Sequence, residues 1–222
     1  MPVVVRTWNL FHGNAQPPER RAFLREMVEL VTADEPDVVC LQEVPLWAFP
    51  HLEDWSGMRA VCATGARPRL GSARLGAWIT ELNHGLLRSA LTGEGLAVLV
   101  SRACELEPLA PVAVGPKRSL ARARVDGMLV VCFHVTGGAV AREQFRRVVD
   151  SVGDEQRVVI AGDVNLRPPY ELNGWSEPLA GSIDQILVRG LPSTPPVAWP
   201  AERRRVEGGL VSDHAPVELS VG

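Results

Sequence analysis

The 222-residue sequence predicts an α/β fold in one domain spanning residues 1–222. Short runs of valine, isoleucine and leucine recur along the chain and are typical of buried strands. Between some of these runs, apolar residues recur every three or four positions, which is typical of helices that cover a sheet. No Gly/Ser linker, charge block or internal repeat divides the sequence, so a single domain is expected.

In the first half, the amphipathic segment after Pro17-Pro18-Glu19 predicts a helix, because proline fits the first helical turn. This helix is expected to end near Asp34-Glu35-Pro36. The periodicity of residues 75–91 is mixed and allows either a helix or a loop against the sheet. Apolar runs predict strands at residues 3–8, 38–42, 58–63 and 96–100.

In the second half, Asp126-Gly127 is a strong turn signal and predicts a hairpin of residues 119–125 and 128–135. An amphipathic helix is expected over residues 139–152. Further strands are expected at residues 158–163, 183–188 and 215–219, with loops at 166–181 and 190–211.

The run Val158-Val159-Ile160 is typical of a buried strand, and Gly162 is expected to let the backbone turn at its end. Asp163 and Asn165 follow two residues apart, so they face the same way in an extended chain. A buried strand therefore delivers a carboxylate and a carboxamide to an edge that a ligand can reach.

The other apolar strands also carry a polar residue near one end. Any one of these could be an ordinary turn residue or a sheet-end histidine. Together they indicate strand ends that converge on one site. They are Asn9, Glu43, His134, Asp184, Asp213 and His214.

Seven motifs resemble those of the endonuclease/exonuclease/phosphatase superfamily and occur in that superfamily's order from residue 8 to residue 216. The superfamily includes pancreatic deoxyribonuclease, and its shared chemistry is metal-assisted hydrolysis of a phosphate ester. The resemblance implies a four-layer α/β/β/α sandwich, with two mixed, mainly antiparallel sheets face to face and helices outside. The motifs are Trp8-Asn9, Leu41-Gln42-Glu43-Val44, Gly93-Glu94-Gly95-Leu96-Ala97, Phe133-His134-Val135, Gly162-Asp163-Val164-Asn165, Ser182-Ile183-Asp184 and Ser212-Asp213-His214-Ala215-Pro216.

The same resemblance implies that Glu43 is the principal metal ligand and that Asn9 and Asp213 belong to the metal site. Hard cations prefer oxygen ligands, so Mg²⁺ is the expected ion, and Mn²⁺ or Ca²⁺ are alternatives.

Carried over by motif, Asp163 orients and deprotonates the attacking water, while His134, His214 and Asn165 donate to the phosphate oxygens. Asp184 is expected to orient His214, and Glu94 to support His134. Three further groups stand outside these motifs. Arg118 is expected to contact the substrate phosphate, and Arg203-Arg204-Arg205 is expected to be a solvated loop. His12 either lines the cleft near Asn9 or is a surface residue, like His51 and His84.

The expected function is hydrolysis of phosphodiester bonds in DNA or RNA. A net charge of −3 argues against a strongly cationic surface, although a metal site itself needs acidic residues. The only tyrosine, Tyr170, follows the Gly-Asp-x-Asn motif, which argues against the abasic-site branch of the superfamily. Two alternatives stay open: a phosphatase or phosphodiesterase for a small-molecule or lipid-headgroup phosphate, and an inactive phosphate-binding module.

The apolar runs are of strand length, below the roughly 18–20 residues that a membrane-spanning helix needs. Met1-Pro2-Val3 leads directly into a strand, without the pattern of a signal peptide. A cytoplasmic monomer is therefore expected. Cys40 and Cys132 lie within apolar strands and are expected to be buried free thiols.

Overall fold

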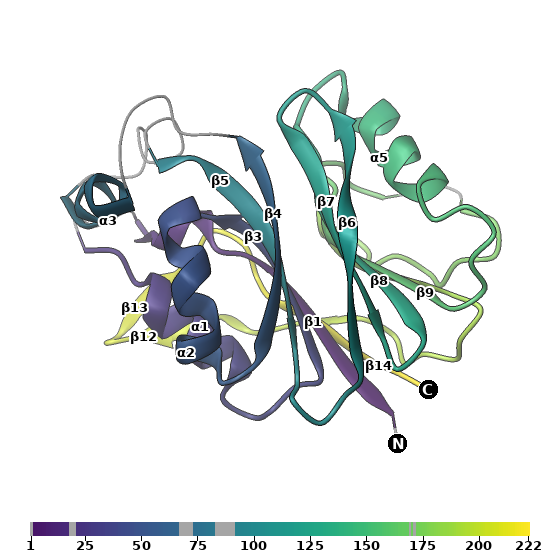
Figure 1. The fold of residues 1–222 in the computed structure, drawn as a ribbon, viewed down its shortest axis with the longest axis horizontal. Helices are drawn as coiled ribbons and strands as arrows, with labels where there is room; N and C mark the ends of the chain where they lie inside the picture. The colour runs from purple at the N-terminus through teal and green to yellow at the C-terminus, as the bar shows by residue number, and fades with distance from the viewer. Residues whose placement is uncertain (1, 18–20, 67–72, 83–91, 169, 171) are drawn as a thin grey trace.

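The computed structural model describes residues 2–17, 21–66, 73–82, 92–168, 170 and 172–222. It confirms the expected four-layer α/β/β/α sandwich (Figure 1). Helices α1 (Leu24–Thr32) and α2 (Leu52–Ser56) cover the outer face of the first sheet, and α5 (Ala141–Asp150) covers the second. Helix α3 (Ala73–Leu82) packs against the segment Leu46–His51.

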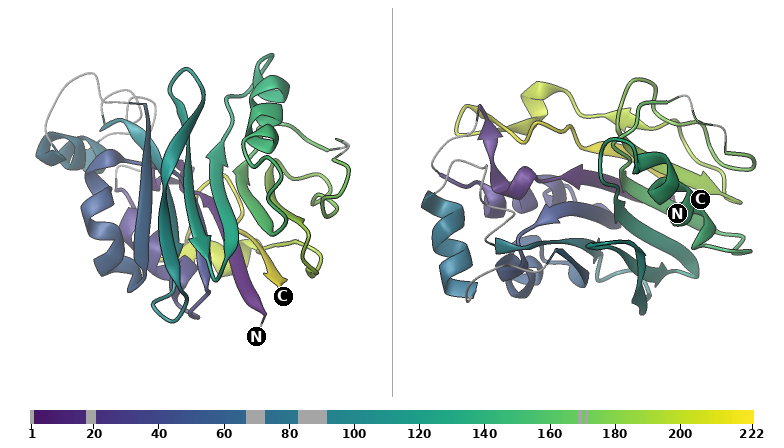
Figure 2. Two further views of the ribbon diagram at one scale, coloured as in Figure 1. Left: turned by 45° about the vertical axis from the view of Figure 1, so that its right-hand side comes forward. Right: turned by 90° about the horizontal axis from the view of Figure 1, so that it is seen from above.

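The first sheet is mixed, with one parallel pair, β1 with β3, among antiparallel neighbours. Because β1 pairs antiparallel with β14, with Val3 opposite Val221, the two ends of the chain lie side by side (Figures 1 and 2). In spatial order the strands are β11 (Val197–Ala198), β14 (Val217–Val221), β1 (Val3–Asn9), β3 (Val38–Val44), β5 (Glu94–Val100) and β4 (Arg59–Ala66).

The second sheet has the same character, because β8 and β9 are parallel and the other pairs are antiparallel. Its spatial order is β10 (Asp184–Arg189), β9 (Val158–Asp163), β8 (Met128–His134), β7 (Arg118–Val125) and β6 (Leu106–Gly115). The remaining short elements are the strands β2 (Ala15–Gln16), β12 (Arg205–Val206) and β13 (Gly209–Val211), which form a third sheet, and the 3₁₀ helices η1 (Phe11–Gly13), η2 (Leu46–His51) and η3 (Ala201–Arg204).

Alternation along the strands divides the apolar core into three layers. In β8, Val130 and Cys132 pack between the sheets, whereas Leu129 and Val131 pack toward α5. The central layer also holds Cys40, and both Cys40 and Cys132 are buried free thiols as expected. In the described part of the chain, no helix is long and apolar enough to cross a membrane.

The structure differs from the expected elements at several places, and the short elements η1, β2, η2 and α2 were not expected. Helix α1 begins at Leu24, several residues after Pro17, and residues 18–20 lie outside the described part. Strand β6 was not expected, because it contains Pro108 and Pro111; it lies at the edge of its sheet, where proline is tolerated. The expected loop 190–211 contains β11, η3, β12 and β13.

Candidate active site

Six strands deliver polar residues to one edge of the sandwich, between the two sheets. Strands β1, β3, β8 and β9 approach this edge with their carboxyl ends, whereas β5 and β10 begin there. In the second sheet Asp163 is paired in register with both His134 and Asp184. The convergence of strand ends expected from the sequence is therefore present. Residues that are distant in the sequence become neighbours at this edge.

Glu43 reaches this edge because β3 is irregular at its end. The register between β3 and β5 shifts between Leu41 and Val44, and Glu43 has a φ of 53°. Such a bulge re-aims a side chain out of the regular alternation of a strand. Glu43 leaves the core pattern in this way and faces the site.

Asn9, the last residue of β1, joins the two sheets. Its Nδ2 donates to Oε1 of Glu43 at 3.2 Å and to Oδ2 of Asp163 at 3.1 Å. Its Oδ1 accepts from the backbone N–H of Phe11 at 3.0 Å. In this arrangement Asn9 is fully buried and fixes the positions of two carboxylates with its amide nitrogen.

Asp163 is the most deeply placed carboxylate of the site, at 1 % exposure. Its Oδ1 accepts from the backbone N–H of Asn165 at 2.7 Å, and its Oδ2 accepts from Nδ2 of the same residue at 3.1 Å. Burial, reinforced by the charge of Asp184, raises the pKa of Asp163 to about 7, against the opposing effects of His214 and the hydrogen bonds. A carboxylate of this kind can accept a proton near neutral pH.

The structure corrects the expected role of Gly162. Strand β9 continues through Gly162 to Asp163, so the glycine does not form the turn. A Cβ atom at this position would lie 2.0 Å from the carbonyl oxygen of Phe133. Gly162 is needed because the backbones of β8 and β9 approach closely beside the site.

His214 and Asp184 form a hydrogen-bonded pair. Nδ1 of His214 lies 2.8 Å from Oδ2 and 3.0 Å from Oδ1 of Asp184, and Nε2 lies 3.9 Å from Oδ2 of Asp163. Burial alone would lower the pKa of His214, but the hydrogen bond to Asp184 and nearby carboxylate charges raise it to about 9. The imidazole of His214 is therefore protonated at neutral pH, and its Nε2 is the nitrogen that faces Asp163.

The backbone around His214 is held by groups outside the expected site. Nε1 of Trp8 and a terminal nitrogen of Arg204 donate to the carbonyl oxygen of His214 at 3.1 Å and 2.6 Å. The hydroxyl of Ser212 accepts from the N–H of His214 and donates to the carbonyl oxygen of Asn9. The expectation for Arg204 was wrong, because its guanidinium reaches inward from η3 instead of lying in solvent.

His134 lies across the site from His214. Its Nε2 is 3.6 Å from Oδ2 of Asp163 and 3.4 Å from Nδ2 of Asn165. Burial and the charge of Arg118 lower its pKa to about 4, so the ring is neutral. A guanidinium can only donate hydrogen bonds. In the 3.4 Å contact between Arg118 and Nδ1 of His134, Nδ1 must therefore accept with its lone pair, and the proton of the neutral ring is on Nε2.

Glu94 lies behind Arg118 in this arrangement. Oε1 of Glu94 accepts from Arg118 at 2.6 Å, and Arg118 also donates to the hydroxyl of Thr136 at 3.0 Å. Glu94 therefore acts on His134 indirectly, by holding Arg118, which contacts the imidazole. Glu94 and Thr136 together fix the position of the Arg118 guanidinium.

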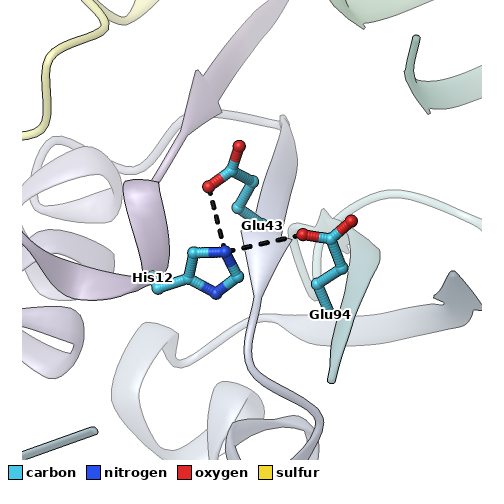
Figure 3. A group of neighbouring side chains, drawn as sticks. All are labelled: His12, Glu43 and Glu94. Atoms are coloured by element: carbon cyan, nitrogen blue, oxygen red, sulfur yellow. Dashed lines mark ion pairs between the residues drawn. The ribbon is translucent and has the colours of Figure 1, made fainter. Parts of the chain in front are cut away.

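His12 lies in the site and not on the surface, which decides between the two expectations for it (Figure 3). It is 5 % exposed and has a left-handed backbone, with a φ of 52°. Its Nε2 is 3.1 Å from Oε2 of Glu43 and 3.5 Å from Oε2 of Glu94.

These contacts change the pKa values of His12 and Glu43. Burial alone would lower the pKa of His12, but the effect of the two glutamates is larger and raises this pKa to about 9. Burial would raise the pKa of Glu43, but His12 and neighbouring groups lower it to about 2.

Among the described residues, two groups of side chains have the composition of a cation site. One is His12, Glu43 and Glu94, and the other is Asp163, Asp184 and His214. Asp213 lies further out: its Oδ1 is 3.7 Å from Nε2 of His214, and its side chain is 41 % exposed. Carboxylate oxygens converging at a protein edge fit a hard divalent cation.

His51 lies away from this site. The ring of His51 stacks on Trp55 with 5.4 Å between centroids, beside α2. His84 lies outside the described residues.

Comparisons with known proteins agree with this geometry. Residues 7–214 match the sequence profile of the Endonuclease/Exonuclease/phosphatase family. A comparison with curated protein sequences finds no match.

Solved structures share the fold over almost the whole chain. Humanized D. rerio TDP2 is 15% identical, with a TM-score of 0.70 over 100% of this chain and 99% of that one. An endonuclease/exonuclease/phosphatase from Beutenbergia cavernae is 17% identical, with a TM-score of 0.68 over 99% of this chain and 71% of that one. D. rerio TDP2 complexed with single strand DNA product is 14% identical, with a TM-score of 0.66 over 100% and 99%.

Proposed function

Because the chain belongs to the endonuclease/exonuclease/phosphatase family, and so to the phosphoester hydrolases, we propose that it is a divalent-metal-dependent nuclease. One observation carries the proposal. The amide nitrogen of Asn9 donates to Glu43 at 3.2 Å and to Asp163 at 3.1 Å. A carboxylate that can bind a cation therefore lies next to a carboxylate that can accept a proton.

Glu43 would hold the divalent cation, with Asn9 and Asp213 as the further metal-site residues expected from the motifs. The low pKa of Glu43, about 2, keeps this carboxylate ionised at any working pH. When bound, Mg²⁺ or Mn²⁺ supplies positive charge that stabilises the developing negative charge on the phosphate.

Asp163 is the proposed general base. Water attacks phosphorus in line, and Oδ2 of Asp163 orients this water and accepts its proton. The pKa of about 7 matches the task, because a base works best when its pKa lies near the operating pH.

His134, His214 and Asn165 surround Asp163 and are the proposed donors to the phosphate oxygens. Both histidines would donate through Nε2, since Nδ1 of His134 faces Arg118 and Nδ1 of His214 faces Asp184. Donors fixed in this way stabilise the charge that develops in the transition state without reorganising.

A nucleic acid is the proposed substrate class, for two reasons. The similar D. rerio TDP2 is known in complex with a single-strand DNA product. The second is the position of Arg118, which the sequence suggested as a phosphate contact: its guanidinium lies 3.4 Å from His134, one of the proposed phosphate donors, while also paired with Glu94.

Hydrolysis assays test the proposal directly. Plasmid DNA, single-stranded RNA and bis-p-nitrophenyl phosphate are incubated with the wild type, Glu43→Gln and His214→Ala, each with Mg²⁺ or Mn²⁺ and with a chelator control. His51→Ala serves as the matched histidine control, because His51 lies on η2, away from the site.

We expect metal-dependent cleavage of a polymer, lost by about 10²-fold or more in both site variants and unchanged in His51→Ala. Cleavage of the small diester alone would refute the nuclease and leave a small-molecule phosphodiesterase. Polymer cleavage that persists in chelator would refute the metal dependence.

A further inference from the structure

We propose that Nε2 of His12 is a ligand of the site's cation, together with Glu43 and Glu94, and that this mixed site prefers Mn²⁺ or Co²⁺ to Mg²⁺ and Ca²⁺. The inference rests on the proposed function, because it specifies the cation that the hydrolase uses.

The geometry of the three side chains carries the first step. Nε2 of His12 faces Oε2 of Glu43 at 3.1 Å and Oε2 of Glu94 at 3.5 Å, and one potential ligand atom from each lies within 4.8 Å of the others (Figure 3). The residues come from η1, β3 and β5, which are distant in sequence. Three potential ligand atoms therefore point at one small volume, and a cation bound there takes the place of the proton on Nε2 of His12, which is released to solvent.

Neighbouring donors hold each carboxylate so that one oxygen stays directed at His12. Oε1 of Glu43 accepts from Asn9 at 3.2 Å, and Oε1 of Glu94 accepts from Arg118 at 2.6 Å. In both cases the second oxygen, Oε2, faces the imidazole. Metal sites are typically built in this way, with outer hydrogen bonds that orient the ligands.

The burial of His12 is a second, independent observation. The side chain is aimed into the cluster, and the residue is only 5 % exposed. Its other ring nitrogen, Nδ1, is buried and has no hydrogen-bond partner among the residues that the structure describes. A histidine buried only for structural reasons is expected to satisfy both nitrogens. Here the polar contacts all lie on the side of Nε2, where a ligand atom belongs.

The composition of the site determines the preferred ion. Mg²⁺ and Ca²⁺ favour sites made of oxygen alone. An imidazole nitrogen beside two carboxylates makes a mixed nitrogen and oxygen site, and nitrogen ligands suit first-row transition ions better than Mg²⁺ or Ca²⁺. Replacing the imidazole with an amide should therefore weaken Mn²⁺ binding much more than Mg²⁺ binding.

Binding of Mn²⁺ can be measured without any turnover. Electron paramagnetic resonance of free Mn²⁺ gives the affinity, and competition with Mg²⁺ gives the preference. Electron spin-echo modulation then reports whether a ¹⁴N nucleus is bonded to the Mn²⁺. The proteins are wild type, His12→Gln, Glu94→Gln and the control His51→Gln.

We expect a nitrogen coupling in the wild type and in His51→Gln that is lost in His12→Gln. We also expect Mn²⁺ affinity to fall by about tenfold or more in His12→Gln and Glu94→Gln, with a change of less than about threefold for Mg²⁺ in His12→Gln.

A wild-type spectrum without nitrogen coupling would overturn the inference, and this measurement stands even if a variant fails to fold. A coupling that persists in His12→Gln would also overturn it and would assign the nitrogen to His134, whose Nε2 is 3.8 Å from Glu43. Failure of the proposed function looks different: Mn²⁺ binds as described here, but no phosphodiester is cleaved.

Discussion

The carboxylate of Asp184, at the start of β10, lies 2.8 Å from Nδ1 of His214, just before β14. These two strands belong to different sheets, so the pair fixes the orientation of the imidazole across the sandwich. It also fixes which nitrogen, Nε2, faces Asp163.

Replacing Asp184 with asparagine should disturb this orientation while keeping the shape of the site. We expect kcat to fall by about 10²–10⁴-fold, because Nε2 of His214 is no longer held in the orientation that faces the site. We expect KM to change by less than about threefold, because the groups that contact the substrate remain. Steady-state kinetics on the preferred substrate measures both constants, and circular dichroism checks the fold. A kcat within threefold of the wild type would remove Asp184 from the mechanism.

Arg204 should act as a positioning residue for His214. Loss of its 2.6 Å hydrogen bond to the carbonyl of His214 in Arg204→Ala frees this segment, and we expect kcat to fall by about tenfold. Arg204→Lys should recover part of the loss. Arg205→Ala is the matched control, because Arg205 donates to the carbonyl of Gly208 in an exposed turn. Equal losses in both alanine variants would show that the loop, and not this contact, matters.

Gly162→Ala should be strongly destabilising. The added methyl group would lie 2.0 Å from the carbonyl oxygen of Phe133, so β8 and β9 must separate. We expect the free energy of unfolding to fall by about 3 kcal/mol or more in urea titrations. In Gly137→Ala the new methyl group lies 3.4 Å from Asn165, and a loss below about 1 kcal/mol is expected. Similar losses in both variants would contradict the close-approach argument.

Asp34 should make stability depend on acid pH. Its hydrogen bonds to Arg6 lower its pKa below the ordinary value of 3.8. The carboxylate therefore stabilises the fold above about pH 4, and this contribution is lost as pH falls through the lower folded-state pKa. The side chain is 54 % exposed, so the contribution is no more than about 1 kcal/mol.

The measurement compares urea unfolding of the wild type and Asp34→Asn from pH 7 to pH 3. We expect the two proteins to differ at pH 7 and to converge below pH 4. A difference that stays constant with pH would assign the effect to something other than the charge of Asp34.

The sequence predicted the strand-end residues well, because strands are short, apolar and alternate with a period of two. Asp163 and Asn165 show both the strength and the limit of this argument. They meet as expected, but Asn165 has a φ of 50°, so a turn after β9 brings them together and not the alternation of an extended strand. His12 and Arg204 were harder, since each acts from an irregular segment whose path depends on distant contacts. Nothing local indicates that His12 adopts a left-handed backbone and turns toward β3 and β5.

The strand order of the first sheet determines when the site is complete during synthesis. Strand β1 is flanked by β3 on one side and by β14 on the other, with Val3 opposite Val221. Asn9, Glu43 and Asp163 emerge from the ribosome before His214, whose segment is anchored only once β14 has docked. It follows that a nascent chain still holding residues 212–221 in the exit tunnel has an incomplete site. A phosphoester hydrolase built in this way therefore completes its site only after β14 has left the ribosome.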